Sequence, residues 1–445
     1  VMPSLYVNLG INYLKLGGEN GGEAVTAFLE AINRDPQNAY PYYRIGKVYQ
    51  SQNNLESFDE YFKKSLAVDP KFPSTYFALY QYYADKNTET AKTNLDLFLL
   101  NADKDPALDI FNADYLFRAG QYEASLAKSK ELEAAVCSTF GSEYAQLTSS
   151  GTAALTTAMA ALGVGAGDEV IMPAFTFVAS FEAILSMGAI PVLVDIDESL
   201  TLSPAAVKAA ITSKTKCVMP VHMCGSMADM DALVAICKEH NLILLEDACQ
   251  SIGGTYKGKR LGTIGHAGTF SFDFVKTITC GEGGVVMTND KEVYTKSDAF
   301  TDHGHDHLGV DRGADLHPAL GYNFRISELH AAVGLAQIKK LDTFLAIQKK
   351  NNHILRSYLE QVPGIQFRVV PDPEGDSGSF LTWFLPSQAL TEKAIAAFKE
   401  AGIFAGNFYW FANNWHYIRK WDHLKNATSL YPLSEAQRNA LIALQ

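Results

Sequence analysis

The sequence predicts an all-helical repeat array followed by a larger α/β domain and a smaller C-terminal α+β domain. Asp-Pro pairs recur at spacings of 34 and 36 residues near the N-terminal end, which indicates repeated helical units. Between residues 163 and 268, short β-branched runs alternate with helical segments, as in βαβ units. Because 445 residues are too many for one compact core, we expect domains at 1–130, 131–360 and 361–445.

The composition excludes several classes of protein. A hydrophobic content of 47% and a charged content of 19% are ordinary for a globular chain. The net charge of -12 argues against a nucleic-acid partner. We find no apolar run long enough for a membrane span and no export signal. The six cysteines form no CxxC pair, so we expect reduced thiols and a cytoplasmic protein.

The first 130 residues contain the repeats. Asp-Pro pairs at 35–36, 69–70 and 105–106 close segments of similar layout, because a proline and the residue before it both disfavour helix. A small residue recurs in the first helix of each pair, at Gly10 and Gly46. This layout resembles the tetratricopeptide repeat. Such arrays often bind a protein or peptide, and the alternative is an array that only packs on the next domain.

The α/β domain should hold a mostly parallel sheet with helices on both faces. The predicted strands are 169–172, 189–194, 217–221 and 242–247, and the helices between them are 178–187, 204–212 and 229–240. Ligands in such folds bind beyond the carboxyl ends of the strands. Polar or aromatic candidates fall at these ends, namely Asp247, His222 and 175–177.

Flanking segments supply further candidates. Gly151 and Thr152 open a helix whose free N–H groups suit a phosphate, although an ordinary capped helix is the alternative. Two helices are expected at 326–338 and 341–359, before a small unit with strands at 365–370 and 380–385 and a helix at 391–401. Its aromatic run, with Trp415 and His416, suits a sugar-facing wall or simple core packing.

Residues 271–289 are the centre of the prediction. We expect a strand, an active-site loop with Lys276, a glycine-rich turn and a second strand. A lysine amine is nucleophilic only when neutral, and an apolar setting favours that form. The alternative is an exposed lysine on the surface.

The full set of candidates matches what pyridoxal phosphate requires. That cofactor needs a lysine amine, an acid at the pyridine nitrogen, a stacking ring, a phosphate cup and a group on the ring hydroxyl. The candidates are Lys276 for the Schiff base, Asp247 for the nitrogen, Phe177 for stacking, Gly151, Thr152 and Ser271 for the phosphate, and Gln250 for the hydroxyl.

Five ordered motifs, SSGTAAL, PAFTFVAS, LLEDACQS, SFDFVKTITCGEGG and GYNFRISELHAA, resemble the DegT/DnrJ/StrS family of sugar aminotransferases. The resemblance covers about 131–445. It implies the aspartate-aminotransferase fold (fold type I) and a homodimer with shared active sites, in which Asn323 of the neighbouring subunit meets the phosphate. It also supports the roles given to Lys276, Asp247 and Gln250. Family members that dehydrate sugars replace this lysine with histidine, so Lys276 favours amination.

Other segments, among them VHMCGSMADMD, DHGHDHLGVDRGAD, PDPEGDS and NNWHY, look like family members that aminate the C8 aldehyde of an oxidised Kdo sugar acid. This implies L-glutamate as donor and a product used in lipopolysaccharide. His222, His303, His305 and Arg312 are then candidate substrate contacts, with Arg312 suited to a carboxylate. The alternating histidines lack the other ligands of a metal shell, so we predict no metal. Two alternatives are an aminotransferase for a nucleotide-linked keto-sugar and an inactive scaffold.

Overall fold

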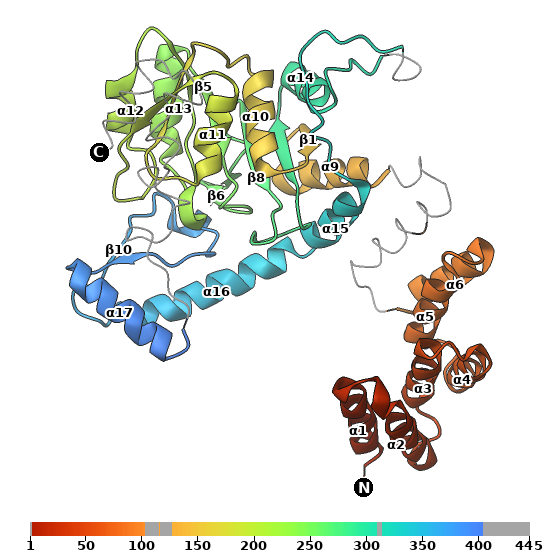
Figure 1. The fold of residues 1–445 in the computed structure, drawn as a ribbon. Helices are drawn as coiled ribbons and strands as arrows, with labels where there is room; N and C mark the ends of the chain where they lie inside the picture. The colour runs from red at the N-terminus through yellow and green to blue at the C-terminus, as the bar shows by residue number, and fades with distance from the viewer. Residues whose placement is uncertain (1, 103–114, 116–126, 309–313, 404–445) are drawn as a thin grey trace. The chain divides into compact units, whose positions relative to one another are not determined.

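The computed structural model describes residues 2–102, 115, 127–308 and 314–403. The chain divides into two compact units, Val1–Ser125 and Leu126–Gln445, and each is described by itself (Figure 1). The third Asp-Pro pair at 105–106, Arg312, Trp415 and His416 lie outside the described residues.

The described part of the first unit is a series of helix pairs. The pairs are α1 (Pro3–Leu16) with α2 (Gly21–Arg34), α3 (Ala39–Ser51) with α4 (Leu55–Val68), and α5 (Pro73–Tyr83) with α6 (Thr88–Asn101). A 3-10 turn, Gly18–Asn20, joins the first two helices. Asp35 and Asp69 end α2 and α4, each directly before a proline. The predicted helical array is therefore confirmed in this part of the chain.

The recurring small residue lets the two helices of a pair approach closely. A Cβ on Gly10 would lie 2.6 Å from the Phe28 ring, and a Cβ on Gly46 would lie 2.3 Å from the Phe62 ring. Both rings are fully buried. Each glycine thus makes room for one aromatic ring of the second helix.

The second unit is built on a seven-stranded sheet. Its order is β1 (Tyr144–Thr148), β9 (Gly284–Thr288), β8 (Ala267–Ser271), β5 (Ile243–Asp247), β4 (Thr215–Val218), β2 (Glu169–Pro173) and β3 (Ile190–Val194). β9 is antiparallel to both of its neighbours, and the other paired strands are parallel. The predicted mostly parallel sheet is confirmed.

Helices cover both faces of this sheet (Figure 1). One apolar cluster joins the sheet to α10 (Gly151–Ala161), α11 (Val178–Ser186) and α14 (Lys291–Thr301). The other joins it to α9 (Ala127–Phe140), α12 (Pro204–Ala210), α13 (Met230–His240) and α15 (Glu328–Ile338). Strand β9 shows the alternation, since Val286 belongs to the first cluster while Val285 and Met287 belong to the second.

The long helix α16 (Leu341–Leu359) leads to a small sheet made of β10 (Gln366–Phe367) and β11 (Trp383–Phe384), followed by α17 (Gln388–Glu400). Both strands are shorter than predicted. Backbone pairing weakens after Phe367, since Arg368 N lies 3.4 Å from Thr382 O and Val369 N donates instead to Glu198 O at 2.9 Å. The side chain of Arg368 donates to the carbonyls of Met223 and Cys224.

Smaller elements complete the second unit. They are the hairpin of β6 (Thr255–Tyr256) and β7 (Lys259–Arg260) and the 3-10 turns Met223–Gly225 and Pro373–Gly375. Among the described residues, no helix combines the length and the hydropathy needed to cross a membrane.

Candidate active site

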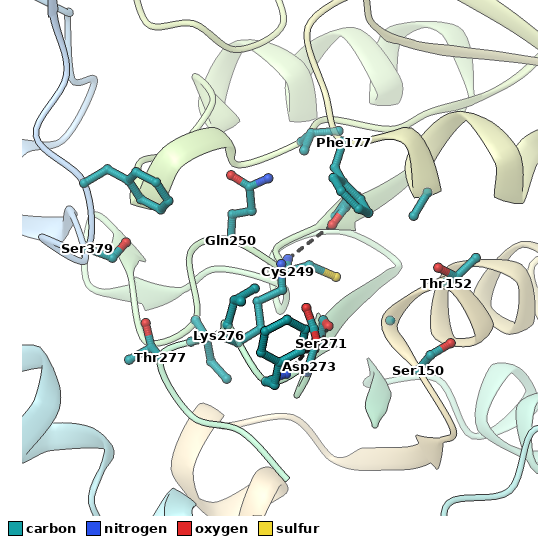
Figure 2. Close-up of a pocket in the computed structure, with 18 of the residues that line it drawn as sticks. Ser150, Thr152, Phe177, Cys249, Gln250, Ser271, Asp273, Lys276, Thr277 and Ser379 are labelled. Carbon is teal, nitrogen blue, oxygen red and sulfur yellow. Dashed lines mark hydrogen bonds between the residues drawn. The ribbon is translucent and has the colours of Figure 1, made fainter. Parts of the chain in front are cut away.

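A cavity of about 920 Å³ opens at the carboxyl end of the sheet. Its walls come from the ends of β5 and β8, the start of α10, the lysine loop and residues of α16. Figure 2 shows polar side chains from these segments around one hollow. Seven residues predicted from the sequence line it: Gly151, Thr152, Phe177, Asp247, Gln250, Ser271 and Lys276.

Asp247 is the buried acid of the cavity, with 4% of its surface exposed. Its Oδ2 accepts a hydrogen bond of 2.6 Å from Ser180 Oγ, and its Oδ1 accepts one of 3.2 Å from the Cys249 backbone N–H. Ser180 Oγ in turn lies 2.8 Å from Thr176 Oγ1. Since the Ser180 hydroxyl hydrogen is used in the bond to the carboxylate, the hydroxyl of Thr176 must be the donor in its hydrogen bond with Ser180. A directional chain of hydroxyls therefore fixes the carboxylate.

The start of α10 forms a cradle for an anion. Ser150 caps the helix by accepting from the Ala153 N–H at 3.1 Å. A Cβ at Gly151 would lie only 2.7 Å from Ser271 Cβ, so glycine lets the helix meet the end of β8. The hydroxyls of Thr152 and Ser271 line the same cavity, beside the positive end of the helix dipole.

The loop between β8 and β9 carries Lys276. Backbone hydrogen bonds from Phe272 N to Gly283 O (2.8 Å) and from Cys280 N to Phe272 O (3.0 Å) close its base. The turn needs glycine at position 281, where φ is +89°. Lys276 Nζ lies 5.9 Å from the centroid of the Phe177 ring. The predicted strand, loop, turn and strand are confirmed, and the amine and the aromatic ring lie on one cavity.

Gln250 is oriented by the backbone of Cys224, which is itself held by Arg368, a residue that the sequence did not single out. Its Oε1 accepts from the Cys224 N–H at 3.1 Å, which leaves Nε2 as a donor. The Cys224 carbonyl accepts from buried Arg368 at 3.0 Å. Arg368 lies far along the chain in a segment without a motif, so only the fold reveals that it holds this loop.

Cys249 also lines the cavity. Burial raises its pKa well above the usual value of a thiol, and the neighbouring Asp247 carboxylate raises it further. Only a thiolate is a strong nucleophile, so Cys249 contributes volume rather than covalent chemistry. All six cysteines are free, as expected from the sequence.

His222 does not reach the cavity. It is fully buried, with Nε2 3.0 Å from Glu246 Oε2 and Nδ1 accepting from the Ala228 N–H at 3.2 Å. Glu246 also accepts backbone N–H groups from Gly262, Ile264 and Gly265. The His222–Glu246 pair therefore joins the loop through Ala228 to the loop at 262–265, next to Asp247. This placement makes His222 a structural residue rather than the substrate contact that its position at a strand end predicted.

The described part of the histidine loop, residues 303–308, is also absent from the cavity lining of its own chain. His303 has a left-handed backbone, with φ +59°, and its carbonyl accepts from His317 Nδ1 at 3.0 Å. His305 Nδ1 lies 3.4 Å from Asp315 Oδ2. Asn323 forms a β-bridge with Asp302 and is absent from the cavity lining. In the described residues no cluster of three or more possible ligands is placed to hold a metal ion.

The groups present fit pyridoxal phosphate. A buried carboxylate with each oxygen already accepting one hydrogen bond suits a pyridinium N–H. The glycine-lined helix start suits the phosphate, and the lysine amine and aromatic ring lie between these ends. The residues that line this cavity are thus of the kinds that the cofactor requires.

Comparisons with known proteins agree with this arrangement. Residues 109–445 match the DegT/DnrJ/EryC1/StrS aminotransferase family, and residues 39–72 match the tetratricopeptide repeat. GDP-perosamine synthase of Caulobacter vibrioides is 34% identical over 282 residues, which are 63% of this chain and 72% of that protein.

Solved structures show the same fold. An aminotransferase from Psychrobacter cryohalolentis superposes with a TM-score of 0.64 at 28% identity, over 77% of this chain and 90% of the other. GDP-4-keto-6-deoxy-D-mannose-3-dehydratase of E. coli, with bound hydrated PLP, superposes with a TM-score of 0.62 at 26% identity, over 73% and 86%. From the family match, the strand order and the cavity, this chain belongs to the DegT/DnrJ/EryC1/StrS aminotransferase family and is a pyridoxal-phosphate-dependent aminotransferase with an N-terminal tetratricopeptide repeat.

Proposed function

We propose that the chain transfers an amino group from L-glutamate to the C8 aldehyde of 8-oxo-3,8-dideoxy-manno-octulosonate, a Kdo derivative used for lipopolysaccharide. The activity is that of an 8-amino-3,8-dideoxy-manno-octulosonate transaminase. The main observation behind this proposal is that Lys276, Asp247 and the start of α10 line one cavity. The segments around the histidine loop support the choice of sugar, and six free cysteines support a cytoplasmic setting.

Each residue of the cavity has a chemical task in this proposal. When bound, the cofactor supplies an electron sink for the carbanion formed at the amino-bearing carbon. Asp247 keeps a proton on the pyridine nitrogen, and Gln250 Nε2 donates to the ring hydroxyl. Lys276 Nζ holds the cofactor covalently at rest and, once released, moves a proton to and from the substrate carbon. Phe177 packs on the ring, and Gly151, Thr152 and Ser271 hold the phosphate.

The charge of the cavity supports a homodimer with shared sites. Among the described lining residues, Asp247, Asp273 and Glu282 are acidic, and Lys276 is the one cation. A phosphate, glutamate and a sugar acid all bring negative charge, which needs further cations. A second subunit placing Asn323, His303, His305 and Arg312 at this opening would supply polar and cationic groups.

Exposed apolar residues also support association of two copies. Phe274 and Val275, next to Lys276, are 74% and 66% exposed. Leu316 and Leu320, which follow the histidine loop, are 70% and 72% exposed. Association of two copies through these segments would cover these side chains.

The test is a substrate comparison with the full chain. Purified protein with pyridoxal phosphate and L-glutamate is offered the oxidised Kdo aldehyde or a GDP-linked 4-keto sugar, and the amine product is measured by mass spectrometry. We expect amination of the aldehyde at a kcat/KM at least tenfold above that for the nucleotide sugar. The opposite ratio would reject the Kdo derivative.

A second candidate is an aminotransferase for a nucleotide-linked keto-sugar. The similarity to a GDP-perosamine synthase favours it. The same comparison decides between the two, because only this candidate requires the nucleotide for turnover. An inactive scaffold, the third alternative, would show no product from either sugar.

A further inference from the structure

The cavity of the second unit has a polar end away from the phosphate cradle. Thr277 and Ser379 line the cavity, and Figure 2 shows them on the side of the hollow opposite Ser150 and Thr152. Thr277 directly follows Lys276 in the chain, so this end lies beside the reactive amine. None of the tasks assigned above uses either hydroxyl, and both are available for a substrate.

One helix brings the two hydroxyl-bearing segments together. Gln348 of α16 donates from Nε2 to Thr277 Oγ1 at 3.3 Å. Asn352 lies four residues further along α16 and thus on the same face of the helix. Its Nδ2 donates to the carbonyls of the two residues that flank Ser379, at 2.8 and 3.5 Å. A single face of α16 therefore holds Thr277 and the Ser379 segment as neighbours.

The segment with Ser379 is fixed by close backbone contacts. Gly378 has a φ of +73°, and a Cβ there would lie 2.8 Å from the backbone of Lys349 in α16, so only glycine fits. On the other side, the Ser377 N–H donates to the Gly225 carbonyl at 2.9 Å. The position of Ser379 in the cavity wall is therefore set by the fold on both sides.

The direction of the hydrogen bonds leaves each hydroxyl with an unused hydrogen. Thr277 Oγ1 accepts from Gln348, so its own hydrogen is not used in that bond. Ser377 Oγ lies 2.9 Å from Ser379 Oγ, and Ser377 is 1% exposed. Because a buried donor without an acceptor is costly and Ser379 is the one acceptor for it among the described residues, Ser377 donates. Thr277 and Ser379 thus both face the cavity as oriented donors.

Gln348 supports this interpretation through an unmatched atom. Its Oε1 is buried and has no hydrogen-bond partner in the part of the chain that the structure describes. An unmatched buried carbonyl destabilises the fold, and an apolar side chain at this position would avoid that penalty. The amide is explained by its other end, because Nε2 orients the Thr277 hydroxyl toward a ligand.

Two neutral donors suit an enzyme that must bind two unlike substrates at one place. An amino-acid donor carries a carboxylate on its amino-bearing carbon, whereas both candidate sugars carry a hydroxyl on the carbon next to the carbonyl. An arginine at this place would match the carboxylate and favour anions. Hydroxyl groups donate to a carboxylate oxygen and to a sugar oxygen alike, and they add no charge that favours one of the two.

We propose that Thr277 and Ser379 determine the dual specificity of the enzyme, by donating to the donor's α-carboxylate in one half-reaction and to the sugar hydroxyl next to the carbonyl in the other. The inference rests on the proposed use of an amino-acid donor and a hydroxyl-bearing sugar. It does not depend on which of the two candidate sugars is aminated.

The test measures the binding of stable conjugates to the full chain freed of its cofactor. Borohydride reduction joins pyridoxal phosphate to an amine in a form that cannot react further. Conjugates of L-glutamate and γ-aminobutyrate differ in the α-carboxylate, and those of ethanolamine and propylamine differ in the hydroxyl. By titration calorimetry we expect at least tenfold tighter binding of the glutamate conjugate and at least threefold tighter binding of the ethanolamine conjugate, within each pair.

Matched variants assign these preferences to the two hydroxyls. Thr277→Val and Ser379→Ala should each lower the preference for the carboxylate at least fivefold and bring the preference for the hydroxyl close to one. Thr277→Ser keeps the hydroxyl and should retain both preferences. Thr343→Val makes the same change at an exposed position of α16 and should also retain both.

The ratios separate binding from a structural role. A variant with a general defect would weaken all four conjugates alike, and unchanged ratios in Thr277→Val and Ser379→Ala would overturn the proposal. Loss of the carboxylate preference with the hydroxyl preference intact would contradict a shared site, as would a wild-type chain without either preference. Because no probe contains an octulosonate or a nucleotide sugar, these ratios stand apart from the outcome of the substrate comparison.

Discussion

At the scale of single residues, the orientation of the Asp247 carboxylate depends on a hydrogen bond from an uncharged side chain. Ser180 Oγ donates to Asp247 Oδ2 at 2.6 Å, and both residues are buried. Short hydrogen bonds to a charged acceptor are about twice as strong as neutral ones. Ser180 is thus a positioning residue that keeps the acid aimed at the cavity.

Ser180→Ala should retain the cofactor and lower the rate of the glutamate half-reaction by about 10- to 150-fold, because a hydrogen bond to a charged group contributes about 1.5–3 kcal/mol. Stopped-flow absorbance measures that rate, and equilibrium dialysis measures cofactor affinity. Ser180→Thr keeps the hydroxyl and should recover most of the rate, whereas Asp247→Asn should lose far more. An unchanged rate in Ser180→Ala would remove Ser180 from this role.

Sequence patterns located the residues that end strands, and they missed those that support them. Asp247 was predictable because an acidic residue ends an otherwise apolar strand, directly after Glu246. Ser180 stands in the quoted motif PAFTFVAS, four residues after Thr176, but nothing local indicates that it faces Asp247. His222 fits the same strand-end rule as Asp247, yet its side chain points to Glu246. The sequence pattern thus shows that a residue lies at the end of a strand. The direction of its side chain depends on the neighbouring loops, which the pattern does not show.

At the scale of elements, the helix pairs of the array depend on glycine. A Cβ at Gly46 would lie 2.3 Å from the Phe62 ring, and that ring is 1% exposed. The ring has no room to move aside because Tyr43 stacks on it, with ring centroids 5.8 Å apart. Helices α3 and α4 therefore cannot keep their spacing if the glycine is replaced.

Gly46→Ala should destabilise the array by about 1–3 kcal/mol, the usual cost of overpacking a core. Gly22→Ala is the control, because a Cβ there meets nothing within 4 Å and alanine favours helix. Urea unfolding followed by circular dichroism should show the difference between the two variants. Equal stability of Gly46→Ala and the wild-type chain would contradict the close approach of the helices.

Elements with a strong period were predictable and short ones were not. The alternation between residues 163 and 268 predicted β2 to β5 and the helices between them within a few residues. Strand β1 has five residues and leads directly into the Ser-Ser-Gly turn. Its short pattern could not be separated from the start of the following helix, so the strand was missed. Helix α14 lacks a strong apolar face in its sequence and was also missed. This helix is stabilised by packing against the sheet, and a local sequence pattern does not reveal such long-range contacts.

At the scale of the whole molecule, the proposed dimer explains why one chain has an acidic cavity. If Lys276 and Asn323 of different subunits share a site, two inactive variants can repair each other. Lys276→Ala and Asn323→Ala subunits, mixed and allowed to exchange, should regain about a quarter of the wild-type rate, because half of the dimers are mixed and each holds one intact site. Turnover by the mixture measures this recovery.

The control is each variant alone, which should stay nearly inactive, together with sedimentation to establish that dimers form. Full activity of Asn323→Ala alone would remove this residue from the site. No recovery in a mixture shown to contain mixed dimers would indicate that each site is complete within one subunit.

The most direct test of the account is the visible absorbance of the full chain before and after L-glutamate. We predict that the wild-type protein, purified with pyridoxal phosphate, shows the band of lysine-bound cofactor and loses it when glutamate is added. Lys276→Ala should lack both the band and the response. A Lys276→Ala protein that kept the band and still reacted with glutamate would contradict the assignment of Lys276.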